Sequence, residues 1–141
     1  MSNPLTKRAI LLAEDNTMHQ RVTSLMLRDV GCDVDIVING EQAFHALTQR
    51  QMAQQQPYDL VCMDCHMPEV NGFEGTRLIR QWEAQQQPAR HIPIIALTAQ
   101  ASHGDREQCL AAGMDDYLSK PLVKVDLQAM LDKWLSQTGV Q

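Results

Sequence analysis

The sequence predicts an α/β protein with a doubly wound parallel sheet in a single domain. Five short apolar runs recur along its 141 residues: Ala9–Ala13, Val34–Ile38, Leu60–Met63, Ile92–Leu97 and Tyr117–Leu118. Most of them are continuous rather than alternating, as in strands that are buried on both faces. A segment with helical character follows each run, and this alternation of strand and helix is typical of a parallel sheet that is covered by helices on both sides.

Four of the intervening segments have apolar residues at helical spacing. The expected core-facing groups are Val22, Leu25 and Met26; Ala43, Phe44 and Leu47; Leu78, Ile79 and Trp82; and Leu127, Met130, Leu131 and Trp134. The segment 105–112 has helix-forming composition but a weak apolar pattern, so we expect a more mobile helix there.

Residues that start and stop helices agree with these assignments. Asn16 or Thr17, Asn39 and Asn71 can cap helix N-termini, and Gly31 and Gly113 can end a helix before a strand. Right-handed crossovers leave few topologies for five strands. The flavodoxin-like strand order 2-1-3-4-5 suits a chain of this length.

Composition and charge exclude several classes of function. Hydrophobic residues make up 44% of the chain, and the net charge is -5 with no basic cluster larger than Lys7-Arg8. We therefore expect a folded core and no binding of nucleic acid. No apolar run is long enough to span a membrane, and the polar N-terminus lacks a secretory signal. We expect a cytoplasmic protein without direct membrane contact, although a membrane-anchored parent chain stays open.

The four cysteines are expected to be reduced thiols. Cys62 and Cys65 form a lone CxxC, and no second ligand pair accompanies it at the spacing of a zinc site. A redox CxxC opens a helix after a strand, whereas Pro68 and Gly72 follow here in an expected loop. We expect Cys62 to be buried in a strand.

Polar residues end four of the five predicted strands. Glu14-Asp15 follow the first, Asp64 the third, Thr98 the fourth and Lys120 the fifth. Ligands in such folds bind at the carboxyl ends of the strands, so these groups should converge. Clustered carboxylates need a cation, and oxygen ligands suit Mg²⁺. A carboxylate beside Mg²⁺ and a lysine could accept a phosphoryl group as an aspartyl phosphate.

The motifs around these residues resemble those of response-regulator receiver domains. The matching stretches are LLAEDN (11–16), MDCHMPEVNG (63–72), ALTA (96–99) and DDYLSKP (115–121). The stretches FEGTRLIR, IPIIALTAQA and AAGMDDYLSKPL are most similar to receivers of hybrid sensor histidine kinases. The resemblance extends over residues 8–136, with residues 1–7 and 137–141 as terminal tails.

The resemblance implies a role for each residue of the magnesium and acceptor site. Asp64 would be the phosphoacceptor. Asp15 would bind Mg²⁺ directly, and Glu14 directly or through water. Glu14 stands where the family more often has Asp, which leaves its direct coordination in doubt. The backbone carbonyl of His66 would be a further metal ligand.

The resemblance also implies a conformational switch. Thr98 would be the switch hydroxyl, Lys120 the phosphoryl-binding ammonium, and Lys120-Pro121 a cis peptide bond. Tyr117 would turn inward on activation, and Ala99 would leave room for a partner histidine. His66 and Gln100 lie where the family tunes autodephosphorylation.

The implied function is that of a signalling domain rather than an enzyme, with self-phosphorylation and autodephosphorylation chemistry. Its partners would be a sensor histidine kinase, a histidine phosphotransfer domain, or both. We expect a piece of a hybrid histidine kinase, with a stand-alone single-domain response regulator or a phosphate-independent interaction module as alternatives. An aspartyl-phosphate phosphatase would need a second Asp at the position of His66, and a flavin protein would need a phosphate loop in place of Glu14-Asp15-Asn16. The sequence is silent on oligomeric state.

Overall fold

The computed structural model describes residues 8–67, 69–99 and 103–139, and it has the predicted topology. Five parallel strands lie in the order β2-β1-β3-β4-β5. The strands are β1 (Arg8–Ala13), β2 (Cys32–Val37), β3 (Leu60–Asp64), β4 (Ile94–Thr98) and β5 (Asp116–Ser119). The helices are α1 (Thr17–Asp29), α2 (Gly40–Met52), α3 (Gly72–Ala84), α4 (His103–Ala112) and α5 (Lys124–Gly139).

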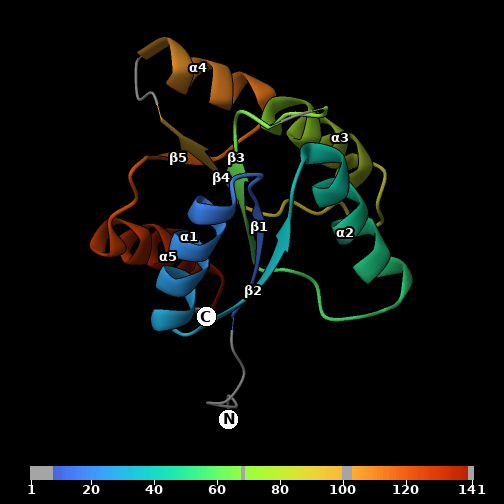
Figure 1. The fold of residues 1–141 in the computed structure, drawn as a ribbon. Coiled ribbons are helices and arrows are strands. Elements are labelled where there is room, and N and C mark those ends of the chain that lie inside the picture. The colour runs from blue at the N-terminus through green and yellow to red at the C-terminus, as the bar shows by residue number, and fades with distance from the viewer. Residues whose placement is uncertain (1–7, 68, 100–102, 140–141) are drawn as a thin grey trace.

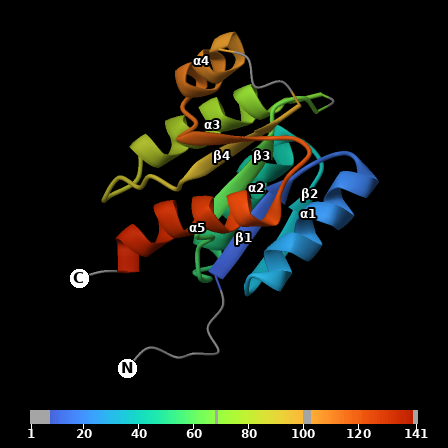
Figure 2. The same cartoon turned by 90° about the vertical axis from the view of Figure 1, so that its left-hand side faces the viewer.

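Helices cover both faces of the sheet (Figure 1). Figure 2 shows α1 and α5 in front of the sheet, with α2, α3 and α4 behind it. Each face has its own apolar core. One core joins the sheet to α2, α3 and α4, and the other joins it to α1 and α5. The side chains of β3 and β4 are buried along the whole of both strands, which explains their uninterrupted apolar sequences.

The second strand differs from its prediction. β2 spans Cys32–Val37 rather than Val34–Ile38, and Asp33, Asp35 and Ile36 on it are exposed. The reason is its place at the edge of the sheet, where β1 is its one neighbouring strand among the described residues and solvent reaches its other side. Burial on both faces therefore holds for the inner strands and not for β2.

The expected core face of α1 is only partly correct, because Met26 is half-buried against the core of α1 and α5 but its two partners are not. Val22 and Leu25 are 42% and 59% exposed, whereas Thr23, Ser24 and Leu27 are buried. Small polar side chains can lie against the neighbouring structure when their hydroxyls bond to the helix backbone, and Ser24 Oγ donates to the carbonyl of Arg21. Val22 and Leu25 thus face outward, whereas Met26 and Leu27 face the core.

The other expected faces are largely correct. Ala43, Leu47, Ile79, Leu127 and Leu131 are buried. Four other members are half-buried: Phe44, Trp82, Met130 and Trp134. Leu78 is 36% exposed.

Helix ends follow the predicted signals. The side chains of Asn16, Asn39 and Asn71 each accept a hydrogen bond from a backbone N–H in the first turn of the helix that follows. Gly31 and Gly113 have φ angles of 93° and 108°, in the left-handed region that favours glycine after a helix. α5 continues to Gly139, into the segment that was expected to be a tail. Residues 1–7, Pro68 and Gln100 lie outside the described part of the chain.

α2 and α3 approach each other closely at two glycines. A Cβ on Gly75 would lie 2.6 Å from Cα of Gly40, and the N–H of Gly40 donates to the carbonyl of Val70 at 2.6 Å. This contact holds the loop between β3 and α3 against the start of α2. Within the described residues, no helix is long and apolar enough to cross a membrane.

Candidate functional site

The predicted site residues meet at the carboxyl edge of the sheet. Parallel register pairs Ala13, the last residue of β1, with Met63 of β3. Glu14, which follows β1, and Asp64, which ends β3, therefore lie at the same level. One carboxylate oxygen from each of Glu14, Asp15 and Asp64 lies within 4.8 Å of the other two. Glu14 and Asp64 are buried and Asp15 is exposed.

Lys120 supplies the opposing charge. Its Nζ donates to Oε1 of Glu14 at 2.8 Å and to Oδ2 of Asp64 at 3.1 Å. These partners are 106 and 56 residues away in sequence. The backbone N–H of Lys120 donates to the carbonyl of Thr98, and the Lys120-Pro121 peptide bond is cis, as expected. The end of β5 therefore directs the ammonium into the acidic cluster.

Burial and charge determine the protonation behaviour of this cluster. Burial raises the pKa of Glu14 above its ordinary value, the hydrogen bond from Lys120 works against this, and the neighbouring Asp64 raises it further. Burial by itself would lower the pKa of Lys120, but its contacts with Glu14 and Asp64 outweigh burial and raise the pKa. Lys120 thus stays charged. Because two carboxylates share this one ammonium, the pocket favours a further cation and disfavours a further negative charge.

Backbone contacts fix the two buried carboxylates. The N–H of Glu14 donates to the carbonyl of Val37, and Oε2 of Glu14 accepts from the N–H of Asn16 at 3.2 Å. Oδ1 of Asp64 accepts from the N–H of His66 at 3.1 Å. His66 contacts the site through its backbone N–H. The role of its carbonyl as a metal ligand, which the resemblance implies, stays a prediction.

The donor set fits a hard divalent cation. Three carboxylates supply oxygen ligands only, and Mg²⁺ prefers a few carboxylates together with water. Exposed Asp15 leaves one side of the cluster open to water. The ionised acids would carry more negative charge than Lys120 alone can balance, which favours the binding of a cation.

The expected switch residues, Thr98 and Tyr117, lie on β4 and β5, the two strands that follow β3 in the sheet. Thr98 is 2% exposed at the end of β4, and Asp64 pairs with its neighbour Leu97 in the sheet register. Tyr117 is half-buried on β5, and the guanidinium of Arg106 on α4 lies 5.7 Å from its ring centre. Ala99 is exposed beside Thr98.

The sequence analysis missed one residue of this pocket. Nδ1 of His19, in the first turn of α1, lies 3.1 Å from Nζ of Lys120 and 3.8 Å from Oε2 of Glu14. The sequence predicts His66 at the site only through its backbone carbonyl, and it predicts no histidine side chain as a metal ligand or catalytic base there. Its position three residues after the cap Asn16 was the available signal, because the first turn of that helix lies above the carboxyl end of β1.

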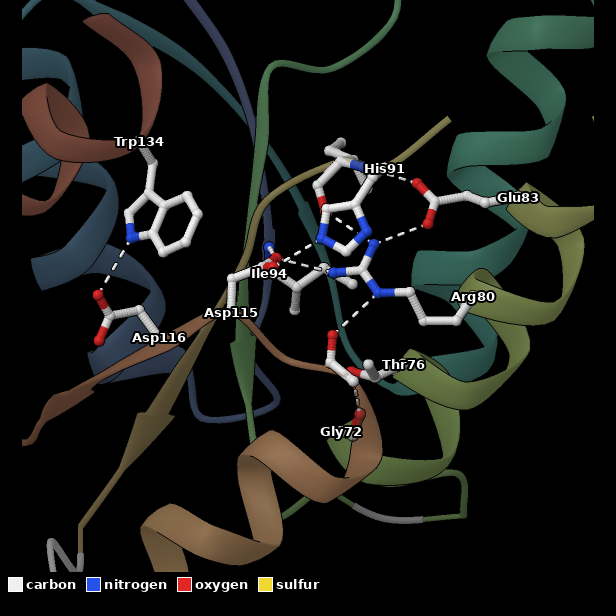
Figure 3. Close-up of polar contacts among 11 residues, drawn as sticks. Gly72, Thr76, Arg80, Glu83, His91, Ile94, Asp115, Asp116 and Trp134 are labelled. Atoms are coloured by element: carbon white, nitrogen blue, oxygen red, sulfur yellow. Dashed lines mark hydrogen bonds and ion pairs between the residues drawn. The ribbon is translucent and has the colours of Figure 1, made fainter. Parts of the chain in front are cut away.

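A second polar cluster lies at the opposite edge of the sheet and serves as scaffold (Figure 3). Arg80 of α3 pairs with Glu83 at 2.7 Å and with Asp115 at 2.8 Å, and its Nε donates to the carbonyl of Gly113. His91 contacts the other oxygen of Asp115 at 2.6 Å. Arg80 thereby ties the C-terminal end of α4 to α3.

The fold and the site define a protein class: a five-stranded receiver fold with three carboxylates and a lysine at the carboxyl edge of its sheet. The response regulator receiver domain family matches residues 10–132, and the chain belongs to this family. It is a receiver domain of two-component phosphorelay signalling. "Histidine kinase 1" of Arabidopsis thaliana is 37% identical over 156 aligned residues, which cover 92% of this chain but only 12% of that protein. The chain thus spans a small part of this curated relative.

Two solved structures are also similar. One is the receiver domain of sensor histidine kinase PA1611 from Pseudomonas aeruginosa PAO1, with a magnesium ion coordinated in its active site cleft. It is 44% identical, with a TM-score of 0.77, and the match covers 93% of this chain and 99% of that one. The other is a complex from Saccharomyces cerevisiae between the histidine phosphotransfer signalling protein Ypd1 and the receiver domain of the response regulator Ssk1. Its matching chain is 27% identical, with a TM-score of 0.83, and the match covers 95% of this chain and 92% of that one.

Proposed function

We propose that Asp64 accepts a phosphoryl group from a phosphohistidine, with Mg²⁺ held by Asp15, Glu14 and Asp64 and by the backbone carbonyl of His66. The observation that carries this proposal is that three carboxylates and one lysine lie together at the carboxyl edge of the sheet. In the transfer, the N–P bond of the donor breaks, an O–P bond to Asp64 forms, and the donor imidazole leaves.

The residues of the chain divide this work. Asp64 is held by the N–H of His66, which leaves its Oδ2 directed toward Lys120 as the attacking atom. Mg²⁺, when bound, neutralises charge on the transferred oxygens. Lys120 pairs with the phosphoryl oxygens after the transfer, since its ammonium already contacts the acceptor.

The added charge then acts as a switch. Thr98 donates its hydroxyl to a phosphoryl oxygen, Tyr117 moves into the space that Thr98 leaves, and the surface of α4, β5 and α5 changes. Tyr117 supports this role because its ring lies between the sheet core and Arg106 of α4.

The donor would dock on α1. Met18, Val22 and Leu25 are 72%, 42% and 59% exposed and form an apolar stripe that starts three residues after Asp15. A stripe of this kind beside the acceptor pocket suits the helical surface of a histidine phosphotransfer domain or kinase. The similarity to receivers in hybrid kinases also supports a hybrid histidine kinase as the parent protein.

Phosphorylation with acetyl phosphate and Mg²⁺ tests the acceptor role. We expect one phosphate in the wild type and none in Asp64→Asn, while Asp33→Asn on the exposed edge strand is labelled like the wild type. Acid-labile phosphate in Asp64→Asn would contradict the assignment. For docking, Leu25→Asp should slow transfer from a phosphorylated histidine phosphotransfer domain and leave labelling by acetyl phosphate unchanged.

A further inference from the structure

Two cysteines meet beside the phosphoacceptor. Sγ of Cys65 lies 3.7 Å from Sγ of Cys109, although the residues are 44 positions apart. Both are 1% exposed, and none of the four cysteines is in a disulfide. A disulfide requires a sulfur–sulfur distance of about 2.05 Å, so the two atoms need to approach by roughly 1.7 Å.

The backbone holds Cys65 in place. It directly follows Asp64, its N–H donates to the carbonyl of Leu97 at 3.1 Å, and its own carbonyl accepts from the N–H of Gly72 at 3.2 Å. Cys65 is therefore fixed between β4 and the start of α3. The backbone on which the two sulfurs can approach each other is therefore that of Cys109 on α4.

Among the described side chains of α4, few are buried at this point. Over residues 106–112, only Cys109 and Ala112 are buried, and Leu110 is 49% exposed. The fixed end of the helix is Gly113, whose carbonyl accepts from Nε of Arg80 at 2.9 Å, and Figure 3 shows Arg80 held in turn by two carboxylates. Cys109 lies about 6 Å from that end along the helix axis, so a small rotation of α4 about Gly113 moves its sulfur by the required amount.

We propose that Cys65 and Cys109 form a reversible disulfide on exposure to a hydroperoxide. One thiolate attacks the peroxide oxygen to give a sulfenic acid and release water or an alcohol. The second thiol then displaces water and completes the disulfide. In total, two thiols are oxidised to a disulfide and the hydroperoxide is reduced. A small dithiol reverses the reaction by thiol–disulfide exchange.

The disulfide fixes α4 to the residue that follows the phosphoacceptor. This consequence rests on the proposed function, because it matters for signalling only if α4 moves when Asp64 is phosphorylated. The oxidised protein then keeps its metal ligands but loses the freedom of α4. We expect acetyl phosphate to label it about tenfold more slowly than the reduced protein.

The other two cysteines form an internal control. Cys32 and Cys62 lie on β2 and β3, with β1 between them, and they are four register positions apart. This offset is about 13 Å along the strands, well beyond the reach of a disulfide.

The test treats the reduced protein with hydrogen peroxide, alkylates remaining thiols in denaturant, and maps the peptides by mass spectrometry. We expect a mass loss of about 2 Da in the protein, a peptide pair joined through Cys65 and Cys109, and alkylation of Cys32 and Cys62 only. Cys109→Ser should lose the joined pair, and Cys32→Ser should keep it. Alkylation of all four thiols in wild type, or a disulfide through Cys32 or Cys62, overturns the proposal.

Labelling with acetyl phosphate then separates this inference from the proposed function. Slow labelling of the oxidised protein, restored by dithiothreitol, supports the coupling. Equal labelling of both forms overturns the coupling. A reduced protein that gains no phosphate at all contradicts the proposed function and leaves the mapped disulfide as evidence for the thiol pair.

Discussion

Replacement of Asp15 by Asn should make the metal-free protein more stable. Asp15 is one of three carboxylates whose oxygens lie within 4.8 Å of one another, and Lys120 contacts only the other two. One pair of like charges at that distance costs about 1–2 kcal/mol when the effective dielectric constant is 40–80, the range for an exposed group. The variant relieves this repulsion without removing a described hydrogen bond from the buried pair. We expect a gain of about 1–2 kcal/mol in the free energy of unfolding, or roughly 3–8 °C in melting temperature.

Urea unfolding followed by circular dichroism, with EDTA or with MgCl₂, measures this effect. Mg²⁺ binds the folded state and should stabilise the wild type but not Asp15→Asn, so the difference between them shrinks or reverses in MgCl₂. Asp33→Asn makes the same change in charge at the far end of the edge strand and should show neither effect. A metal-free Asp15→Asn protein that is no more stable than the wild type, or that still gains stability from Mg²⁺, would refute the electrostatic reasoning.

Three further predictions concern the scaffold. Arg80→Met leaves the mostly buried carboxylates of Glu83 and Asp115 without their partner. It should lower the free energy of unfolding in urea at neutral pH by about 3–5 kcal/mol. A loss under about 1 kcal/mol would contradict this. Gly75→Ala places a Cβ 2.6 Å from Cα of Gly40. It should lower the free energy of unfolding, measured by thermal unfolding, by at least about 1–3 kcal/mol. An unchanged melting temperature would show that α2 and α3 separate freely. Burial and the hydrogen bond to Asp35 raise the pKa of Tyr58 to about 12, so the stability from this bond is present below pH 10 and is lost as pH rises through about 12. Tyr58→Phe should cost about 1 kcal/mol at pH 7, and absorbance titration of the wild type should show one phenol ionising near pH 12.

Patterns within short segments predicted the inner strands and the caps correctly. Continuous apolar runs identify β3 and β4 because a strand that is buried on both faces has no polar side to show. Asn39 and Asn71 were identifiable because a cap bonds to the N–H groups of the next few residues. The same patterns failed for two of the three residues predicted on α1, since the apolar spacing of Val22 and Leu25 does not say whether they meet the sheet or solvent.

The sequence by itself determined the strand order and the group of acids and lysine at the carboxyl edge. Parallel strands with right-handed crossovers bring their ends to one edge whatever the side chains do there, so Asp15, Asp64 and Lys120 could be grouped from their places after strands. Only the tertiary structure decided that His19 reaches Lys120 and that Cys65 meets Cys109. These contacts depend on how helices rotate and side chains point when distant segments pack, and such directions are set by the whole core rather than by any local pattern.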